Sequence, residues 1–218
     1  MKSSRYLRSR VVVFVLASLI LALSGCATPR QGPGLPEVNI GVVEFTQPQS
    51  VLEMLAGHMP EDAPRVHPKV LTELDEALAR VLREETKRTY APMETFLGCR
   101  DAKAPSHVSG RATALRHWIA VGSCMKVDFL LVPQVINWQE REGSQAGVTR
   151  PAGITLDFFL IDIKNAVLTS RSHFDEMQTA LAENLLETRK FLSRGARWIS
   201  AIELAREGML KAIRDMGL

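Results

Sequence analysis

The sequence predicts an α/β domain, with α+β as the alternative, built on a single mixed sheet of about five strands with helices packed on it. Three observations lead to this prediction. Short β-branched segments alternate with helical patterns in the first half of the chain. Longer apolar segments then follow one another as a meander, and two amphipathic patterns close the chain. The predicted order of elements is β-α-α-β-α-β-β-β-α-α.

The spacing of apolar residues and the capping residues predict the first elements, a strand, a short helix and a long helix. Residues 38–45 (VNIGVVEF) are mostly apolar and predict a strand buried on both faces. Residues 50–53 (SVLE) resemble a capping box and predict a short helix that ends near Gly57. Residues 68–89 carry leucines and a valine at spacings of three and four, which predicts a long helix with one buried stripe.

The middle of the chain predicts a strand, a helix and a second strand. Residues 90–96 are expected to form a short strand. Ser109 is a candidate N-cap for a helix that ends near Gly122. Residues 128–138 (DFLLVPQVINW) predict a well-formed strand, followed by a polar turn.

The last third predicts a hairpin and two helices. Residues 154–163 and 166–174 are expected to pair around Lys164-Asn165. One helix is expected over residues 179–192. The other is expected to begin at Ser200, where SAIE is a second capping-box match.

The N-terminus has the pattern of an export signal. Residues 1–10 carry four basic residues and no acid, and residues 11–23 are apolar. The apolar run is shorter than the roughly 20 residues that a membrane-spanning helix needs. An uncleaved signal anchor or an ordinary secretory signal remains the alternative.

The residues Leu23-Ser24-Gly25-Cys26 resemble the lipobox of bacterial lipoproteins. The resemblance implies cleavage between Gly25 and Cys26, a diacylglycerol on the Cys26 sulfur and an acyl group on its new amino group. It implies a membrane-anchored lipoprotein that faces the periplasm. Ala27, where Asp would favour retention in the inner membrane, favours the outer membrane.

These features predict three regions. Residues 1–25 would be the removed signal peptide, and residues 26–36 the lipidated cysteine with a tether rich in Pro and Gly. Residues 37–218 would form a single periplasmic domain. Removal of the signal peptide leaves 23 basic against 24 acidic residues, a net charge of about −1. The mature chain therefore offers no excess of positive charge for nucleic acid, and no nucleic-acid partner is expected.

Two cysteines remain in the predicted domain, Cys99 and Cys124. An exported location permits a disulfide between them. Two free thiols are the alternative, since a buried cysteine also serves as a small apolar residue. No Cys/His spacing suggests a metal site.

The chain resembles a group of periplasmic lipoproteins that share the fold of the TolB amino-terminal domain. The residues that carry the resemblance are GVVEF at 41–45, VDFLLVPQVINW at 127–138, and LDFFLIDIKNAVLTS at 156–170 with the later FDE. That group includes activator lipoproteins of penicillin-binding proteins and the soluble domain of the curli secretion channel. The chain is too short for the membrane-inserting hairpins of that channel, which disfavours a pore. The resemblance implies a binding domain and no catalytic residues.

A search for chemistry finds no nucleophile elbow, metalloprotease motif, P-loop or dinucleotide fingerprint. We therefore predict no enzyme activity, and no cofactor apart from the lipid on Cys26. Asp157 and Asp162, in an apolar strand, either mark a binding cleft or lie at a sheet edge or hydrogen-bond to a loop. One basic cluster with an aromatic residue is a candidate interaction patch, with a solvated loop as the alternative; its members are Arg189, Lys190, Arg194, Arg197 and Trp198.

The resulting hypothesis is a non-enzymatic, lipid-anchored adaptor of the cell envelope. Its partners would be the bilayer, through the acyl chains, and another envelope protein or a cell-wall component. One alternative is an oligomeric accessory of outer-membrane assembly or secretion. Another is a periplasmic solute-binding protein or an enzyme whose site is dispersed in sequence. The sequence leaves the oligomeric state open.

Overall fold

A computed structural model describes residues 35, 37–58, 60, 64–102, 111–178 and 188–218. The chain divides into a unit of residues 1–31 and a compact unit of residues 32–218. The first unit lies wholly outside the described residues, as do the predicted signal peptide, Gly25, Cys26 and most of the tether. Among the helices that are described, none has the length and apolarity needed to cross a membrane.

The main sheet has four strands in the order β1-β2-β5-β6. β1 (Ile40–Val42) runs parallel to β2 (Phe129–Gln139). β5 (Gly153–Asp162) is antiparallel to β2 and to β6 (Val167–Met177). The sheet is therefore mixed, which confirms the predicted fold class. The main sheet is one strand smaller than expected, because the predicted strand over residues 90–96 is not part of it. β3 (Glu142–Gly143) and β4 (Val148–Arg150) form a separate two-stranded pair.

The β5–β6 hairpin turns where the sequence predicts. Asp162 accepts hydrogen bonds from the backbone and the side chain of Asn165, each 2.8 Å long. Ala166 takes a left-handed conformation with φ of 55°. These bonds are formed by residues close in sequence, so the turn is encoded locally.

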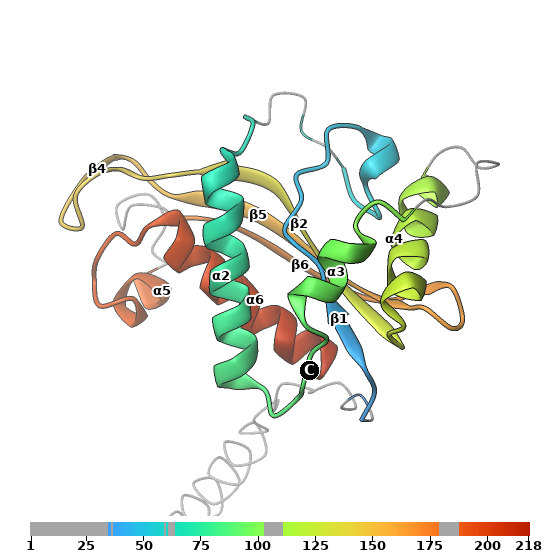
Figure 1. Cartoon of the computed structure of the whole chain (residues 1–218). Coiled ribbons are helices and arrows are strands. Elements are labelled where there is room, and N and C mark those ends of the chain that lie inside the picture. The colour runs from blue at the N-terminus through green and yellow to red at the C-terminus, as the bar shows by residue number, and fades with distance from the viewer. Residues whose placement is uncertain (1–34, 36, 59, 61–63, 103–110, 179–187) are drawn as a thin grey trace, which may run out of the picture. The chain divides into compact units, whose positions relative to one another are not determined.

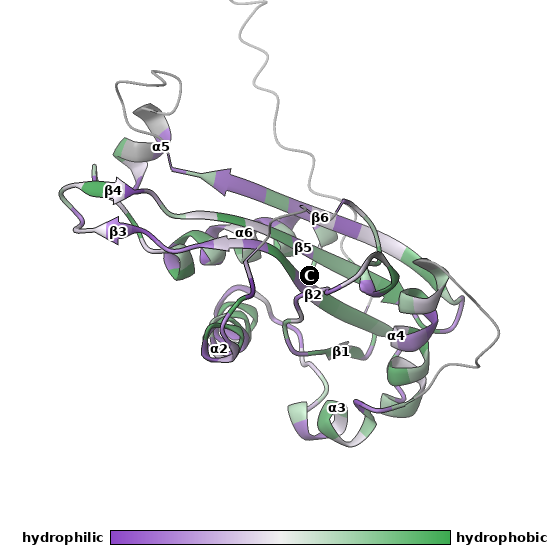
Figure 2. Cartoon of the chain, turned by 90° about the horizontal axis from the view of Figure 1, so that it is seen from above, coloured by the Kyte–Doolittle hydropathy of each residue, from purple (hydrophilic) through white to green (hydrophobic). Residues whose placement is uncertain are grey.

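Alternate residues of the central strands divide between two cores. Leu131 and Val135 of β2 pack with α2 (Pro68–Glu85) and α6 (Ala201–Met216). Leu130 and Val132 pack with α3 (Met93–Cys99) and α4 (Arg111–Met125) on the other face. The helices thus cover both faces of the sheet, with α2 crossing over α6 (Figure 1). Figure 2 shows the apolar β2 and β5 inside this arrangement and the more polar β6 at the edge of the sheet.

Caps define the ends of the two longest helices. At the start of α6 the Ser200 hydroxyl accepts from Glu203 N, and the Glu203 carboxylate accepts from Ser200 N at 2.8 Å. This confirms the capping box predicted there. Gly217 ends α6 with φ of 67°, in the left-handed region that glycine favours. α2 begins at Pro68 as expected and ends at Glu85, four residues before the predicted end.

The strand predicted over residues 90–96 is wrong. Tyr90 forms only an isolated bridge to Ile40, and Ala91 N donates to Ile40 O. Pro92, which has no backbone N–H to give to a strand ladder, directly precedes α3. Phe96 therefore faces the second core from a helix.

The remaining helices differ from expectation at their ends. α4 continues to Met125, beyond its predicted end near Gly122. A Cβ at Gly122 would lie 2.3 Å from Ile163 Cδ1, so this glycine permits close packing of helix on strand. The segment 50–53 forms a single 3-10 turn, η1 (Val51–Glu53), in place of a helix that reaches Gly57. α5 (Thr188–Ser193) is the described part of the helix predicted over 179–192, and Ser109 lies outside the described residues.

Candidate functional site

A row of polar side chains crosses the sheet on the face that carries α4. Thr46 forms a bridge with Gln134 of β2. Gln134 is paired with Asp157 of β5, and Asp157 with His173 of β6. Directly paired residues point to the same face of a sheet, so the four side chains lie side by side. Residues as far apart as 46 and 173 thus form one polar strip at the edge of an apolar core.

Asp157 is the anchor of one half of this row. Its side chain is 2 % exposed, and its carboxylate accepts from Arg171 Nε at 2.9 Å and Nη2 at 3.0 Å. His173 Nδ1 lies 2.9 Å from the same carboxylate. The two bonds to one guanidinium have the bidentate form that compensates burial of a carboxylate. Asp157 therefore lies inside the sheet and pairs with two side chains of the neighbouring strand β6, whereas the sequence suggested a cleft, a sheet edge or a bond to a loop.

Asp162 is also accounted for by local bonds. The hydrogen bonds from Asn165 hold the pKa of its carboxyl below the usual value. This carboxylate therefore stabilises the hairpin turn as an anion. Asp157 and Asp162 are thus both hydrogen-bonded, and neither is an unpaired carboxylate in a cavity.

Gln134 and Thr46 form the other half of the row and carry unpaired oxygens. Gln134 is 1 % exposed, and its Nε2 donates to Glu53 O of η1 at 3.1 Å. Gln134 Oε1 and Thr46 Oγ1 are buried and have no hydrogen-bond partner. Buried side-chain oxygens usually have one, so two neighbouring exceptions mark this place. The only sign of this place in the sequence is the glutamine within the apolar run FLLVPQVINW.

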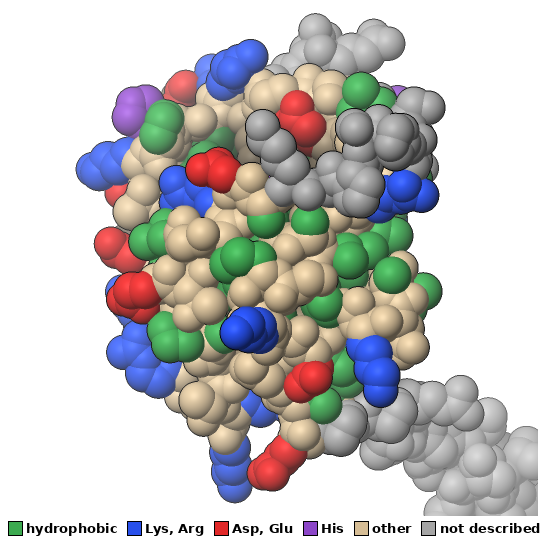
Figure 3. Space-filling view, turned by 45° about the vertical axis from the view of Figure 1, so that its right-hand side comes forward, with side chains coloured by type: hydrophobic (Ala, Val, Ile, Leu, Met, Phe, Trp, Pro, Cys, Tyr) green, Lys and Arg blue, Asp and Glu red, His purple; other side chains and the backbone are tan. Residues whose placement is uncertain are grey.

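A cavity of about 470 Å³ lies above these two oxygens. Residues of η1, α3 and α4 form its walls, and Thr46 and Gln134 belong to its lining. Its apolar lining residues are Pro48, Leu52, Phe96, Ala114 and Trp118. Figure 3 shows hydrophobic side chains gathered on this side of the domain, with charged side chains mostly around them. We call this space the η1–α3–α4 cavity.

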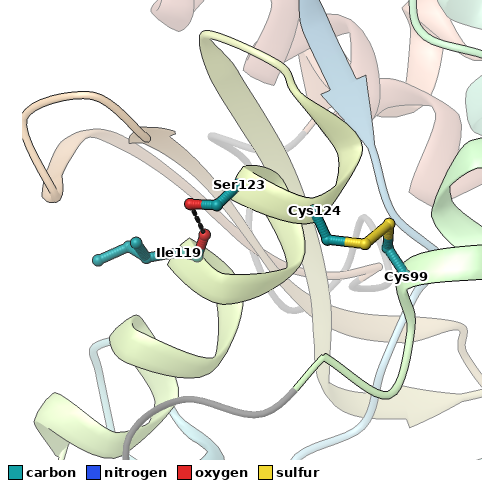
Figure 4. The surroundings of a disulfide bond; sticks show 4 residues. All are labelled: Cys99, Ile119, Ser123 and Cys124. Carbon is teal, nitrogen blue, oxygen red and sulfur yellow. Dashed lines mark hydrogen bonds between the residues drawn. A yellow bond between two sulfur atoms is a disulfide. The ribbon is translucent and has the colours of Figure 1, made fainter.

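The disulfide joins the two helices that form its walls. Cys99 at the end of α3 is bonded to Cys124 in the last turn of α4, with the Cα atoms 5.7 Å apart (Figure 4). Next to it, the Ser123 hydroxyl donates to Ile119 O at 2.7 Å. Of the two alternatives that the sequence left open, the structure has the bonded pair. The bond fixes the distance between the helices that carry Phe96 and Trp118.

The described residues of the cavity lining carry two carboxylates and one guanidinium. Glu44 and Arg100 form a two-bond ion pair, with distances of 2.7 and 2.8 Å, and Glu53 accepts from Gln49 N at 2.8 Å. The Arg100 guanidinium also lies 5.6 Å from the centre of the Phe96 ring. Burial lowers the pKa of His117, whose ring packs edge-on against Trp118. These described lining residues therefore offer no unpaired cation, and the cavity does not suit an anionic ligand.

A second apolar cavity, of about 360 Å³, lies between α2 and the segment that leads into α3. Asp75 lines it and accepts from Phe45 N at 2.6 Å. Burial raises the pKa of Asp75 from 3.8 to about 6. This cavity contains no buried oxygen without a partner, so it offers a ligand fewer specific contacts.

The basic cluster does not form a free positive patch. Arg194 is 8 % exposed and bonds to Glu207 at 2.7 Å and Glu176 at 3.1 Å. Lys190 pairs with Glu176 at 2.8 Å. These pairs tie α5 to β6 and α6.

Two further members of the cluster, Arg197 and Trp198, also make contacts within the domain. Arg197 pairs with Glu203 at 2.7 Å. Trp198 N donates to Gln145 O. The Arg189 side chain lies outside the described atoms. The glutamates come from distant segments, which is why the sequence overstated the charge of this patch.

No metal-binding group emerges from the part of the chain that the structure describes. Within it, no three side chains of His, Cys, Asp or Glu are placed to hold an ion together. The arrangement of the η1–α3–α4 cavity, apolar walls over polar lining groups, is that of a binding site.

Comparisons with known proteins find similar folds only. No protein-family model matches the chain, and no curated protein matches it in sequence. A PelC dodecamer from Paraburkholderia phytofirmans is 14% identical, with a TM-score of 0.44 over 86% of this chain and 93% of that one. The LpoB C-terminal domain from Escherichia coli is 12% identical, with a TM-score of 0.38 over 67% of this chain and 88% of that one.

A third solved structure is the lipoprotein GNA1162 from Neisseria meningitidis. It is 13% identical, with a TM-score of 0.39 over 75% of this chain and 99% of that one. At such identities and TM-scores these structures do not assign the chain to a family. The function is therefore argued from the chain itself.

Proposed function

We propose that this protein is a lipid-anchored component of the bacterial cell envelope that binds another envelope component without catalysing a reaction. The observation that carries the proposal is the run Leu23-Ser24-Gly25-Cys26 behind a basic and apolar leader. Lipidation of Cys26 would add two or three acyl chains. Each buried methylene contributes about 0.8 kcal/mol, so several chains anchor a protein stably.

A binding role is supported by the η1–α3–α4 cavity. Most of its walls are apolar, and Glu44 and Arg100 neutralise each other, while Glu53 adds a carboxylate at the lining. His117 is the one histidine among the described residues of its lining and packs on Trp118. These groups suit recognition of an apolar surface or side chain that carries no negative charge. Ala27 favours the outer membrane as the site of action.

The proposal is tested on the native protein beside Cys26→Ser. Intact mass of the purified protein should show loss of residues 1–25 and a gain of diacylglycerol and acyl groups. Membrane fractionation should place the wild type with the outer membrane, and Cys26→Ser should retain its leader or become soluble. Photo-crosslinking from positions around the cavity should then capture an envelope component in cells. If the wild type and Cys26→Ser have the same processing and the same membrane distribution, the lipid anchor is refuted.

The solute-binding alternative remains a prediction. A domain without a cavity of several hundred Å³ would have contradicted it, and cavities of about 360 and 470 Å³ are present. Crosslinking distinguishes the two hypotheses, because a solute-binding protein would give no macromolecular adduct at the rim of the cavity.

A further inference from the structure

We infer that the η1–α3–α4 cavity binds an aromatic ring that carries one hydrogen-bond donor, such as a phenol or an indole. The inference deepens the proposed binding function by naming the chemistry that this site recognises. It depends on three properties of the cavity: two unpaired oxygens, aromatic walls and a lining without an unpaired cation among its described residues.

The first property fixes the polar part of the ligand. Gln134 Nε2 donates to Glu53 O, so the orientation of the amide is set and Oε1 must be the free acceptor. Thr46 Oγ1 is next to it across the strand bridge and is also unpaired. Both oxygens have lost water without gaining a protein partner, which is costly. A ligand that brings an N–H or O–H to this place recovers that cost.

The second property fixes the apolar part. Phe96 of α3 and Trp118 of α4 are 2 % and 7 % exposed and line the cavity from two sides. The disulfide holds their helices together, so the two rings are positioned before a ligand arrives. Aromatic side chains pack favourably on another aromatic ring in offset or edge-on geometry.

The third property excludes an anionic ligand. Glu44 and Arg100 are already paired, burial lowers the pKa of His117, and Glu53 adds a second carboxylate to the lining. A carboxylate entering the cavity would lose water without gaining an unpaired cation. A phenol or an indole has the required form, because it is an uncharged ring with one donor at its edge.

The cavity can be entered from the η1 side. Leu52 is 53 % exposed and stands at the edge of the lining, in a single 3-10 turn. Thr46 and Gln134 both belong to the lining, so a ligand in the cavity lies beside their side chains. The volume of about 470 Å³ exceeds that of one ring, so the ring would carry a further group. The ring can therefore belong to a small molecule or to a Tyr or Trp side chain of a partner protein.

The test compares two probes that differ by one hydroxyl, N-acetyl-tyrosinamide and N-acetyl-phenylalaninamide. Binding to the mature lipoprotein is followed by NMR, using the side-chain amide of Gln134 and the indole N–H of Trp118. We expect the tyrosine probe to bind at least about tenfold more tightly, which corresponds to about 1.4 kcal/mol. Equal affinities, or binding of neither probe, would overturn the inference.

Two variants test the polar contact. Thr46→Val and Gln134→Met keep the size of the side chain and remove its oxygen. We expect them to abolish the preference for the tyrosine probe while the phenylalanine probe binds as before. Ala79→Leu in the second cavity is the matched control and should leave both affinities unchanged. Unfolding by urea verifies that each variant is folded. A preference that survives in both polar variants would also contradict the inference.

A third probe distinguishes the two sources of the ring. If p-cresol binds as tightly as N-acetyl-tyrosinamide, the site recognises a free small molecule. If the capped amino acid binds more tightly, the site recognises a side chain on a peptide. Either result supports the assigned chemistry. If none of the probes binds, but Cys26 is lipidated and the crosslinking captures a partner, this inference is overturned and the proposed function stands.

Discussion

At the scale of single residues, the polar row shows two ways of burying polar groups. The Asp157 carboxylate is hydrogen-bonded to Arg171 and His173, whereas Gln134 Oε1 and Thr46 Oγ1 have no hydrogen-bond partner. Gly57 lies beside the Arg171–Asp157 ion pair. Its φ is +94°, and a Cβ there would lie 3.0 Å from Arg171 Nη2. The chain after η1 therefore closes over the Arg171–Asp157 pair.

We expect Asp157→Asn to lower the free energy of unfolding. The amide cannot balance the Arg171 charge, and breaking a fully buried ion pair costs about 3–5 kcal/mol. Arg171 is 33% exposed, so we expect a smaller loss of about 1–3 kcal/mol. Urea unfolding measures it. Asp175→Asn on the exposed side of β6 is the control, with an expected change within about 0.5 kcal/mol. Equal effects of the two substitutions would contradict the role of the pair.

Asp75 makes the stability of the domain depend on pH. Its pKa is raised from 3.8 to about 6 in the folded state, so the folded chain binds a proton that the unfolded chain does not. This proton stabilises the fold fully below about pH 4, and the stabilisation is lost as the pH rises through 6. Relative to Asp75→Asn, the wild type should become more stable as the pH is lowered from 6 to 4. Urea unfolding at several pH values measures this difference, and a constant difference would contradict it.

At the scale of elements, the prediction from sequence succeeds where the signal is local. The capping box of α6, the Lys164-Asn165 turn and the apolar run of β2 are each contained within a few residues. The segment 90–96 failed because its apolar residues fit a strand or a helix equally well in a short window. Packing against the second core, together with Pro92, decides between them.

The Cys99–Cys124 bond connects α3 and α4 across 25 positions of sequence. Cys99→Ala with Cys124→Ala should lower the free energy of unfolding by about 3 kcal/mol, because the unfolded chain regains the freedom of an open loop. Urea unfolding of the oxidised protein, with and without reductant, measures this loss. Ser123→Ala, one residue from the bond, is the control. A change below about 1 kcal/mol in the double variant would show that the helices are held by packing alone.

At the scale of the whole molecule, the candidate site could not be predicted because its residues are distant in sequence and only the fold brings them together. The polar row takes residues 46, 134, 157 and 173 from four segments. Their proximity follows from the strand order and register, which no short window of sequence contains. The ion pairs of the basic cluster could not be predicted for the same reason. Glu176, Glu203 and Glu207 neutralise it from β6 and α6.

The start and the end of the described domain lie together. Leu35 N donates to Gly217 O, and Arg88 bonds to Leu35 O. Figure 1 shows the C-terminus at one end of the domain and η1 at the other. A fluorescent protein or affinity tag added after Leu218 would therefore stand beside the point where the chain enters the domain. It would leave the mouth of the η1–α3–α4 cavity open, whereas an insertion at residues 49–53 would block it.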